Sequence, residues 1–161
     1  MSLYSFIRTL LLVCGIFSLS VQAADMNFKG ALIDPPPCSI NNGALIDVDF
    51  GDRVGINKVN GVNYRQQVNY QIICAPGVKG WDLTLTLKGV ATAFDKSAVQ
   101  TDQPDLGIRI LQNKESFPLE STIIVDPKSP PVLEAVPVVK LGGSLQEGIF
   151  EAAATLQANY Q

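Results

Sequence analysis

The sequence GIFEAAATLQANYQ, residues 148–161, decides the fold of this chain of 161 residues. Apolar and small side chains recur at every second position from Phe150 to Tyr160, and most positions between them are polar. A period of two is typical of a β-strand with one buried face. Chain ends usually fray, so a half-buried strand in this place needs a neighbour to cover it. The nature of that neighbour is the central question of the sequence.

The rest of the chain predicts further short strands with Gly and Pro turns between them, and no convincing helix. The cleanest pattern is that of residues 81–88, where Trp81 is in phase with three leucines, so we expect it in the core. Short strands with such turns favour an antiparallel β-sandwich. The other predicted strands are residues 45–50, 68–74, 106–111, 121–125 and 136–141.

Two connections between these strands have their own composition. Residues 89–104 are long and polar, so we expect a surface excursion there. Residues 127–137 are rich in proline, which cannot donate to a ladder, so we expect them along a sheet edge.

The first 23 residues are typical of a signal peptide. Arg8 precedes an apolar run over residues 10–17, and small residues stand just before Ala24. The alternatives are a retained membrane anchor, for which the run is short, and a lipoprotein, for which Val13 is too large beside Cys14. We expect cleavage before Ala24 and export of residues 24–161.

Export leaves two cysteines, Cys38 and Cys74, in the mature chain. An even number of cysteines in an exported protein favours one disulfide over two free buried thiols. Closing a loop of this length stabilises a fold by roughly 4 kcal/mol in the chain-entropy view.

Composition excludes several functions. The chain has no histidine, which removes the Ser-His-Asp and Cys-His catalytic sets and the common zinc sites. The carboxylates are scattered, and Asp47 and Asp49 alternate with apolar residues, so we expect them in solvent rather than in a calcium loop. The net charge is −3 without a basic patch, which gives no support to a nucleic-acid partner. We therefore expect no enzyme, no metal and no cofactor.

A second amphipathic pattern lies just after the predicted cleavage site. Residues 26–32 alternate between the set Met26, Phe28, Gly30 and Leu32 and more polar positions. Three prolines at 35–37 follow, and they favour a stiff extended spacer without backbone donors. Either this arm projects away from the domain, or it is an ordinary first strand with a proline break.

Taken together, these features resemble the subunits of chaperone–usher pili of the type 1 and P pilus class. The resemblance rests on the arm FKGAL at 28–32, on PCSINNG at 37–43, on Cys74 within a strand, and on Gly148 and Tyr160, the fourteenth and second residues from the end. It spans essentially the whole chain.

The resemblance implies an all-β fold, an incomplete immunoglobulin-like β-sandwich. Residues 38–161 would form a six-stranded pilin domain that lacks its final strand, and residues 24–37 would form an N-terminal donor-strand extension. The missing strand leaves a groove beside the last strand. A periplasmic chaperone fills it first, and the arm of the next subunit then replaces the chaperone by strand addition.

The same resemblance assigns residues to these roles. The donor strand would use Met26, Phe28, Gly30 and Leu32, with glycine where the groove is shallow. The alternative for the alanines of the last strand is simple packing against the opposite sheet. The acceptor groove and chaperone contact would be Gly148, Phe150, Ala152, Ala154, Leu156, Ala158, Tyr160 and Gln161, with the Gln161 carboxylate meeting a basic anchor.

The expected function is therefore that of a structural fimbrial subunit. A minor or adaptor subunit near the tip, contributing to cell adhesion, is the first choice, followed by a rod subunit and a base terminator. Its partners would be the chaperone, the outer-membrane usher and neighbouring subunits, and it would pass through the periplasm to the cell-surface fimbrium. Outside this class, the alternative is a secreted carbohydrate-binding module, which would expose an aromatic platform.

Overall fold

The computed structural model of the chain describes residues 25–32, 34, 37–75 and 80–161. Its contacts divide the chain into two units, Met1–Ile33 and Asp34–Gln161. Residues 25–32 have no regular secondary structure and are exposed. The predicted signal peptide, residues 1–23, lies outside the described residues.

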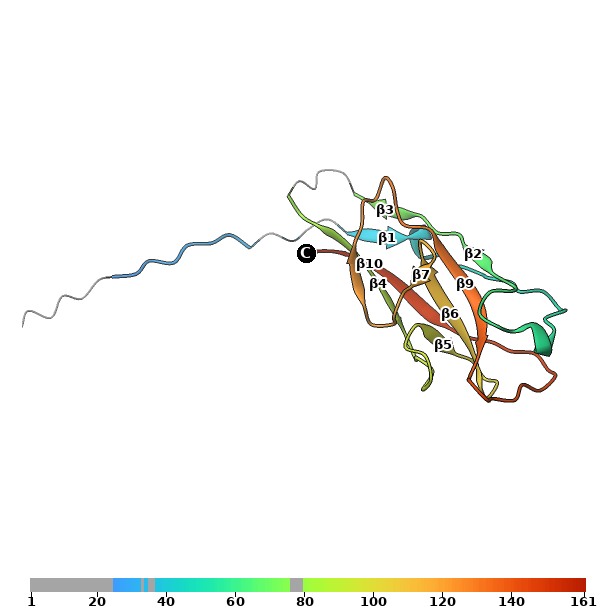
Figure 1. Cartoon of the computed structure of the whole chain (residues 1–161). Helices are drawn as coiled ribbons and strands as arrows, with labels where there is room; N and C mark the ends of the chain where they lie inside the picture. The colour runs from blue at the N-terminus through green and yellow to red at the C-terminus, as the bar shows by residue number, and fades with distance from the viewer. Residues whose placement is uncertain (1–24, 33, 35–36, 76–79) are drawn as a thin grey trace, which may run out of the picture. The chain divides into compact units, whose positions relative to one another are not determined.

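The second unit is built from strands, which confirms the predicted all-β class (Figure 1). Within its described residues there is no α-helix, and two short 3-10 helices, η1 (Asn41–Gly43) and η2 (Ile56–Lys58), lie in one connection. The strands are β1 (Cys38–Ile40), β2 (Gln66–Val68), β3 (Ile72–Cys74), β4 (Leu83–Gly89), β5 (Ala98–Gln100), β6 (Leu106–Gln112), β7 (Glu115–Ser116), β8 (Thr122–Ile124), β9 (Leu133–Val139) and β10 (Ala154–Tyr160).

The strands form three hydrogen-bonded sheets in antiparallel register. One sheet has the order β10-β4-β8, and the pair β1-β3 lies beside it. The opposite sheet has the order β2-β9-β6-β5, with β7 added to β6. The apolar faces of the layers meet in one core, which the leucines of β4 join to Ile108, Ile110 and Leu133. Three predicted leucines, Leu83, Leu85 and Leu87, are therefore buried as expected.

The predicted strand 68–74 is divided between two sheets. Its start belongs to β2, which pairs with β9, and its end is β3, which pairs with β1. Residues 69–71 cross between the layers, and the Tyr70 hydroxyl donates a hydrogen bond of 2.7 Å to the Pro131 carbonyl. The alternation of half-buried and exposed residues continues through the crossing. The half-buried residues are Val68, Tyr70, Ile72 and Cys74.

Two expectations about the connections are wrong. Residues 89–104 are not only a surface excursion, because they contain β5, where Ala98 and Val99 are buried against β6. The proline-rich segment ends inside β9, a central strand, where Pro137 is fully buried. The Pro137 carbonyl accepts from Gly61 N (3.2 Å), on the flank of β9 beyond the end of β2. Along a strand the N–H and C=O of one residue point to the same flank, so the missing N–H removes no ladder bond.

The motif CSINNG at 38–43 forms β1 and a left-handed turn. Asn41, Asn42 and Gly43 have φ values of 47°, 54° and 81°. Asparagine and glycine tolerate this region best, which explains their place after a strand. Asn41 also fixes the neighbouring crossing segment, because its Oδ1 accepts a hydrogen bond of 2.7 Å from Gln71 N.

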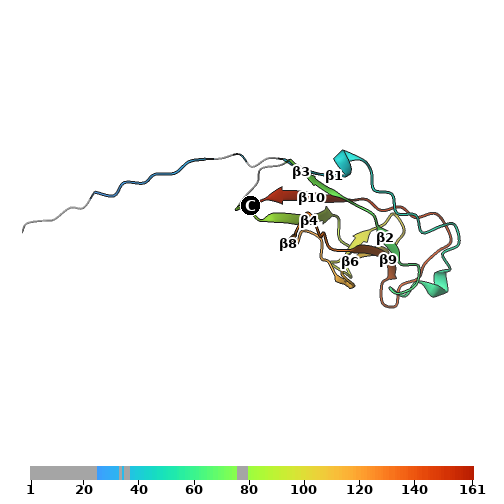
Figure 2. The same cartoon turned by 90° about the horizontal axis from the view of Figure 1, so that it is seen from above.

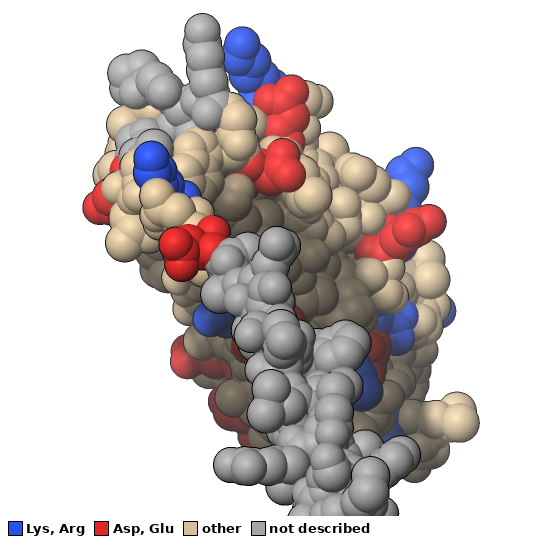
Figure 3. Space-filling model, turned by 90° about the vertical axis from the view of Figure 1, so that its left-hand side faces the viewer, with Lys and Arg blue, Asp and Glu red and all other residues tan. Residues whose placement is uncertain are grey.

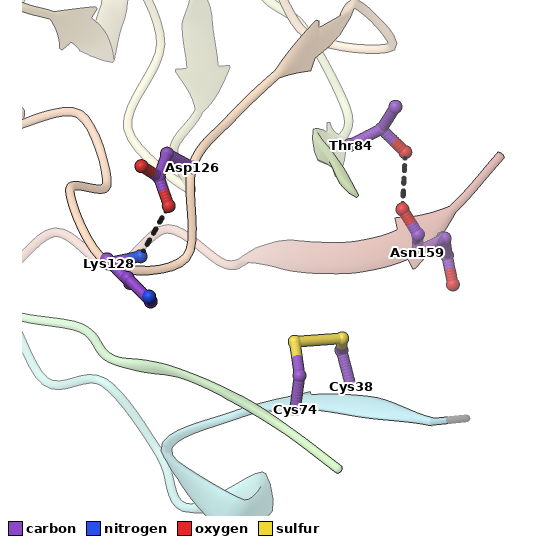
Figure 4. Close-up of a disulfide and its surroundings, with 6 residues drawn as sticks. All are labelled: Cys38, Cys74, Thr84, Asp126, Lys128 and Asn159. Carbon is purple, nitrogen blue, oxygen red and sulfur yellow. Dashed lines mark hydrogen bonds between the residues drawn. A yellow bond between two sulfur atoms is a disulfide. The ribbon is translucent and has the colours of Figure 1, made fainter. Parts of the chain in front are cut away.

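The disulfide Cys38–Cys74 is present and confirms the pairing expected from the sequence. Figure 4 shows that it joins β1 directly to β3, where the two cysteines are partners in the register. It thus locks the first strand of the domain to the strand that leaves the crossing.

Two long connections lie at the end of the domain opposite the C-terminus. Residues 44–65 follow η1, and residues 140–153 precede β10, and both views place them together (Figures 1 and 2). The predicted strand at residues 45–50 belongs to the first connection and is not a strand in the structure. These two connections form the walls of the site described next.

Candidate functional site: an open strand edge and its groove

Among the strands that the structure describes, β10 has a hydrogen-bonded partner on one flank only. It pairs with β4 over its whole length, from Ala154 opposite Gly89 to Tyr160 opposite Leu83. Strand β1 lies on the other flank, yet within the described residues no backbone hydrogen bond joins β1 to β10. Each strand carries donors and acceptors on both flanks. The open flank of β10 therefore presents unpaired backbone groups to an incoming strand.

A groove of about 1700 Å³ continues from this open flank. One wall consists of residues from 45–59, and the other of residues from 145–154. Its floor is formed by core side chains of the opposite sheet, among them Val99, Leu106, Ile108, Ile110 and Ala135. A groove with an apolar floor and an adjoining open strand edge has the shape that strand addition requires.

An aromatic pair links the two walls. The rings of Phe50 and Phe150 lie 5.9 Å apart between centroids and are tilted by 44°. Both rings also pack on the core. Aromatic pairs in this range are attractive, so the pair favours the approach of the two walls to each other.

The predicted groove residues fall into two sets. Gly148, Phe150, Ala152 and Ala154 line the groove. Leu156, Ala158, Tyr160 and Gln161 do not line it and lie further along the chain, where Ala158 is only 7% exposed and belongs to the core. Packing against the opposite sheet, the alternative considered for the alanines, thus describes Ala158, whereas Ala152 and Ala154 are exposed.

Gly148 sits where a side chain would crowd its neighbour. A Cβ at this position would lie 2.9 Å from Gln103 Nε2. Gln103 Nε2 donates a hydrogen bond of 2.9 Å to the carbonyl of the adjacent Ile149. The glycine therefore lets the segment before β10 dock on the β5–β6 connection.

The predicted donor residues lie in the other unit and are exposed. Met26, Phe28 and Leu32 have exposed fractions of 78%, 83% and 105%. A Cβ at Gly30 would meet nothing within 4 Å. Exposed apolar side chains at alternate positions are costly in water unless a partner covers them.

The sequence reasoning missed one wall and most of the floor. Val48, Val54 and Ile56 line the groove from a connection without strand structure. Asp47 and Asp49 are exposed, as their alternation with Val48 and Phe50 predicts, but the strand predicted at residues 45–50 is absent. The floor residues carried no separate signal, because a side chain that lines a groove and one that fills a core look alike in a sequence.

Trp81 is not the core residue that its phase predicts. It is 39% exposed and precedes β4. The pairing with the chain end stops just short of it, at Asp82, which exchanges backbone hydrogen bonds of 3.2 and 2.9 Å with Gln161. The phase argument against an exposed aromatic platform is therefore wrong for this residue.

A smaller hollow of about 460 Å³ lies at the sheet crossing beside Tyr70. Burial raises the pKa of Tyr70 to about 12.

Among the described residues, no cluster of three or more Cys, Asp or Glu could hold a metal ion, and no helix is long and apolar enough to cross a membrane.

The fold and the open edge define a pilin-like class, and comparison with known proteins agrees. The profile of the family described as "Fimbrial protein" matches residues 26–161. The chain is 35% identical to the "Uncharacterized fimbrial-like protein YfcQ" of Escherichia coli K12, over 96% of this chain and 99% of that protein. It is 34% identical to YfcR of the same organism, over 94% and 91% of the two chains.

Solved structures give the same fold. The P pilus adaptor subunit PapF superposes with a TM-score of 0.59 at 28% identity, covering 80% of this chain and 98% of that one. The P pilus rod subunit PapA superposes with a TM-score of 0.63 at 18% identity, covering 85% and 99%. The predicted immunoglobulin-like pilin fold is thus confirmed.

The chain belongs to the fimbrial protein family. It is a non-enzymatic structural protein, a fimbrial subunit of the chaperone–usher class, and its place is the surface fimbria, among other pilus components.

Proposed function

We propose that this subunit assembles by donor-strand exchange and serves as a minor or adaptor subunit near the fimbrial tip, where it contributes to adhesion. The open flank of β10 beside the groove carries the first part of the proposal. Residues 24–37 act as the donor strand for a neighbour, and residues 38–161 act as the acceptor. A periplasmic chaperone and an outer-membrane usher bring the two together.

The groove suits an inserted strand because its small side chains leave room. Ala152 and Ala154 are exposed along the lining, next to buried floor residues such as Ile108. Covering this apolar floor would stabilise the complex by roughly 25 cal/mol per Å² of apolar area removed from water. Backbone hydrogen bonds to the open flank of β10 would add to the affinity and would fix the register of the inserted strand.

The groove assignment is tested by filling the space with side chains. In Ala152→Leu/Ala154→Leu, the added methylenes occupy the path of the incoming strand, so entry of a peptide of residues 25–34 into the chaperone-bound subunit should slow by about 10-fold or more. Ala153→Leu, one residue away and out of phase, is the matched control. Displacement of chaperone is followed by native electrophoresis, and equal slowing by both variants would contradict the assignment.

The donor role is tested by truncation. Removing residues 24–34 leaves the groove intact, so the shortened chain should still bind its chaperone. It should no longer cap the groove of a neighbouring subunit, because Met26, Phe28 and Leu32 are gone. A truncated chain that still capped its neighbour would show that the arm is not the donor.

The chaperone contact is proposed along the same flank of β10, with Tyr160 and Gln161 at its end. Deleting these two residues removes the last pairs with Leu83 and Asp82. Chaperone affinity, measured by co-purification or titration, should fall. Unchanged affinity would place the contact elsewhere.

The adaptor position is supported by the 28% identity to the adaptor PapF, against 18% to the rod subunit PapA. Copy number distinguishes the two positions. Quantitative mass spectrometry of purified fimbriae should find about one copy per fibre, and immunogold labelling should mark one end. Labelling along the whole length would instead identify a rod subunit.

A further inference from the structure

The rim of the groove is acidic. Five carboxylates line it, with Asp47, Asp49 and Asp52 on one wall and Glu147 and Glu151 on the other. Among the described residues that line the groove, there is no lysine or arginine. All five are exposed, so they surround the opening without being part of the apolar floor.

Most of these charges have no cation beside them. Only Asp52 has a basic neighbour within the described chain, Arg53, at 4.0 Å, and both side chains are almost fully exposed. Elsewhere in the described chain some acidic residues are paired, as Asp95 is with Arg109 at 2.6 Å and Asp105 with Lys140 at 3.5 Å. The molecular face in Figure 3 likewise shows acidic and basic side chains interspersed. The groove lining therefore carries one sign of charge, whereas the face in Figure 3 carries both.

A strand seated in this groove would present its charges to this rim. In an extended strand, alternate side chains point to opposite faces, so apolar residues enter the groove and the residues between them remain near its mouth. Like charges brought together at an interface are unfavourable, and complementary ones accelerate the encounter.

The chain's own arm is a poor match for this rim. Residues 25–34 contain Asp25, Lys29 and Asp34, a net charge of −1. Lys29 is the one positively charged residue of this arm. It is out of phase with the groove-facing set Met26, Phe28, Gly30 and Leu32, so it would face the mouth of the groove.

Building on the donor-strand function proposed above, we propose that this groove selects the donor arm of a different subunit, one with lysine or arginine at its outward-facing positions. A second copy of this chain is then a slow occupant, which limits runs of identical subunits. The acidic rim acts mainly on the rate of capture, and the apolar floor acts on the lifetime of the complex.

Matched arm peptides test this selection. All three keep the groove-facing residues 26, 28, 30 and 32. The first is the natural sequence of residues 25–34, the second carries Asn27→Lys and Ala31→Lys, and the third carries Asn27→Glu and Ala31→Glu. The measurement is the rate at which each labelled peptide displaces chaperone from the complex with this subunit, at low and at high salt.

At low salt the lysine peptide should enter about 10-fold faster than the glutamate peptide, with the natural arm between them. The difference should shrink to within about 2-fold at roughly 0.5 M salt, because exposed charges are then screened. Equal rates at low salt, or a natural arm as fast as the lysine peptide, would overturn the proposal.

Two variants locate the effect. Asp47→Asn/Glu151→Gln neutralises one carboxylate on each wall and should reduce the difference between the lysine and glutamate peptides. Glu115→Gln/Asp126→Asn changes the net charge equally but lies outside the groove lining, and it should leave the difference intact. An equal loss in both variants would show a general charge effect and contradict selection by the rim.

Failure of the function and failure of the selection have different signatures. If no peptide enters, or if Ala152→Leu/Ala154→Leu leaves every entry rate unchanged, donor-strand exchange into this groove is wrong. If all three peptides enter at one rate and this variant blocks all of them, the exchange stands and selection by charge is wrong.

Discussion

The two halves of residues 148–161 share one alternating pattern but have opposite surroundings. In residues 156–160 the apolar face is covered, because Ala158 belongs to the core and Leu156 and Tyr160 pack against it. In residues 148–154 it lines an open groove, and Ala152 and Ala154 are exposed. The difference shows that periodicity reports which face could be buried, while the neighbouring strands decide whether it is buried within the chain.

The largest expected effect comes from releasing the strands beside the covered half. Cys38→Ser/Cys74→Ser removes the link between β1 and β3 and should lower the free energy of unfolding by roughly 4 kcal/mol. The measurement is urea unfolding of the subunit with its groove filled by an arm peptide. Retention of wild-type stability would show that β1 holds its place without the link.

Two alanine-to-leucine variants, one in each half, compare the two halves directly. Ala158→Leu overfills the core and should cost about 1–3 kcal/mol, whereas Ala154→Leu should cost under about 0.5 kcal/mol in the empty, chaperone-released subunit. Differential scanning fluorimetry of both variants provides the comparison. Equal destabilisation would mean that residue 154 is covered in solution.

A hydrogen bond anchors the covered half to β4. Thr84 Oγ1 donates to the Asn159 carbonyl at 2.8 Å, and Thr84 is buried (Figure 4). Thr84→Val should cost about 1 kcal/mol, since the carbonyl keeps its place but loses a partner. Thr155→Val, at an exposed position of β10, should change stability by less than half as much. Hydrogen exchange of the β10 amides measures the loss locally.

The smallest effect at neutral pH concerns Tyr70, which lies at the sheet crossing away from both halves. Burial raises its pKa to about 12 from 10.0, so the folded state favours the neutral phenol. Its contribution is complete below pH 10 and is lost as the pH rises through 12. Tyr70→Phe should flatten the decline of stability between pH 10 and 12. A variant with the same decline as wild type would contradict the assignment.

Much of the fold was predictable because a strand buried on one face carries apolar residues at every second position. The leucines of β4 and the alternation from Val68 to Cys74 gave strand faces that the structure keeps. The pattern does not say which sheet a strand joins, so the crossing at residues 69–71 was not foreseen. Pro137 suggested a sheet edge because it cannot donate to a ladder. Only the pairing around β9 shows that no ladder bond is needed on the flank where its N–H is missing.

The groove was predictable in part, for a related reason. Phe150, Ala152 and Ala154 stand in the pattern and do line it. Val48 and Phe50 alternate in the same way but lie in a connection without a ladder. Alternation measures one-sided burial, and a wall segment held by side chains alone produces it as well as a strand does. Trp81 shows the converse. It is in phase with the buried leucines of β4, yet it precedes that strand and is not covered.

The bond between Cys38 and Cys74 has a mechanical consequence. Pro37 is adjacent to Cys38 in the sequence, and its carbonyl accepts from Ala75 N at 3.3 Å. A pull on the chain from the side of Pro37 therefore enters at Cys38 and crosses the covalent bridge to the neighbourhood of Ala75. Residues 39–73 form the loop that the bridge closes, so the bridge protects the backbone of this loop from being pulled out straight by that force.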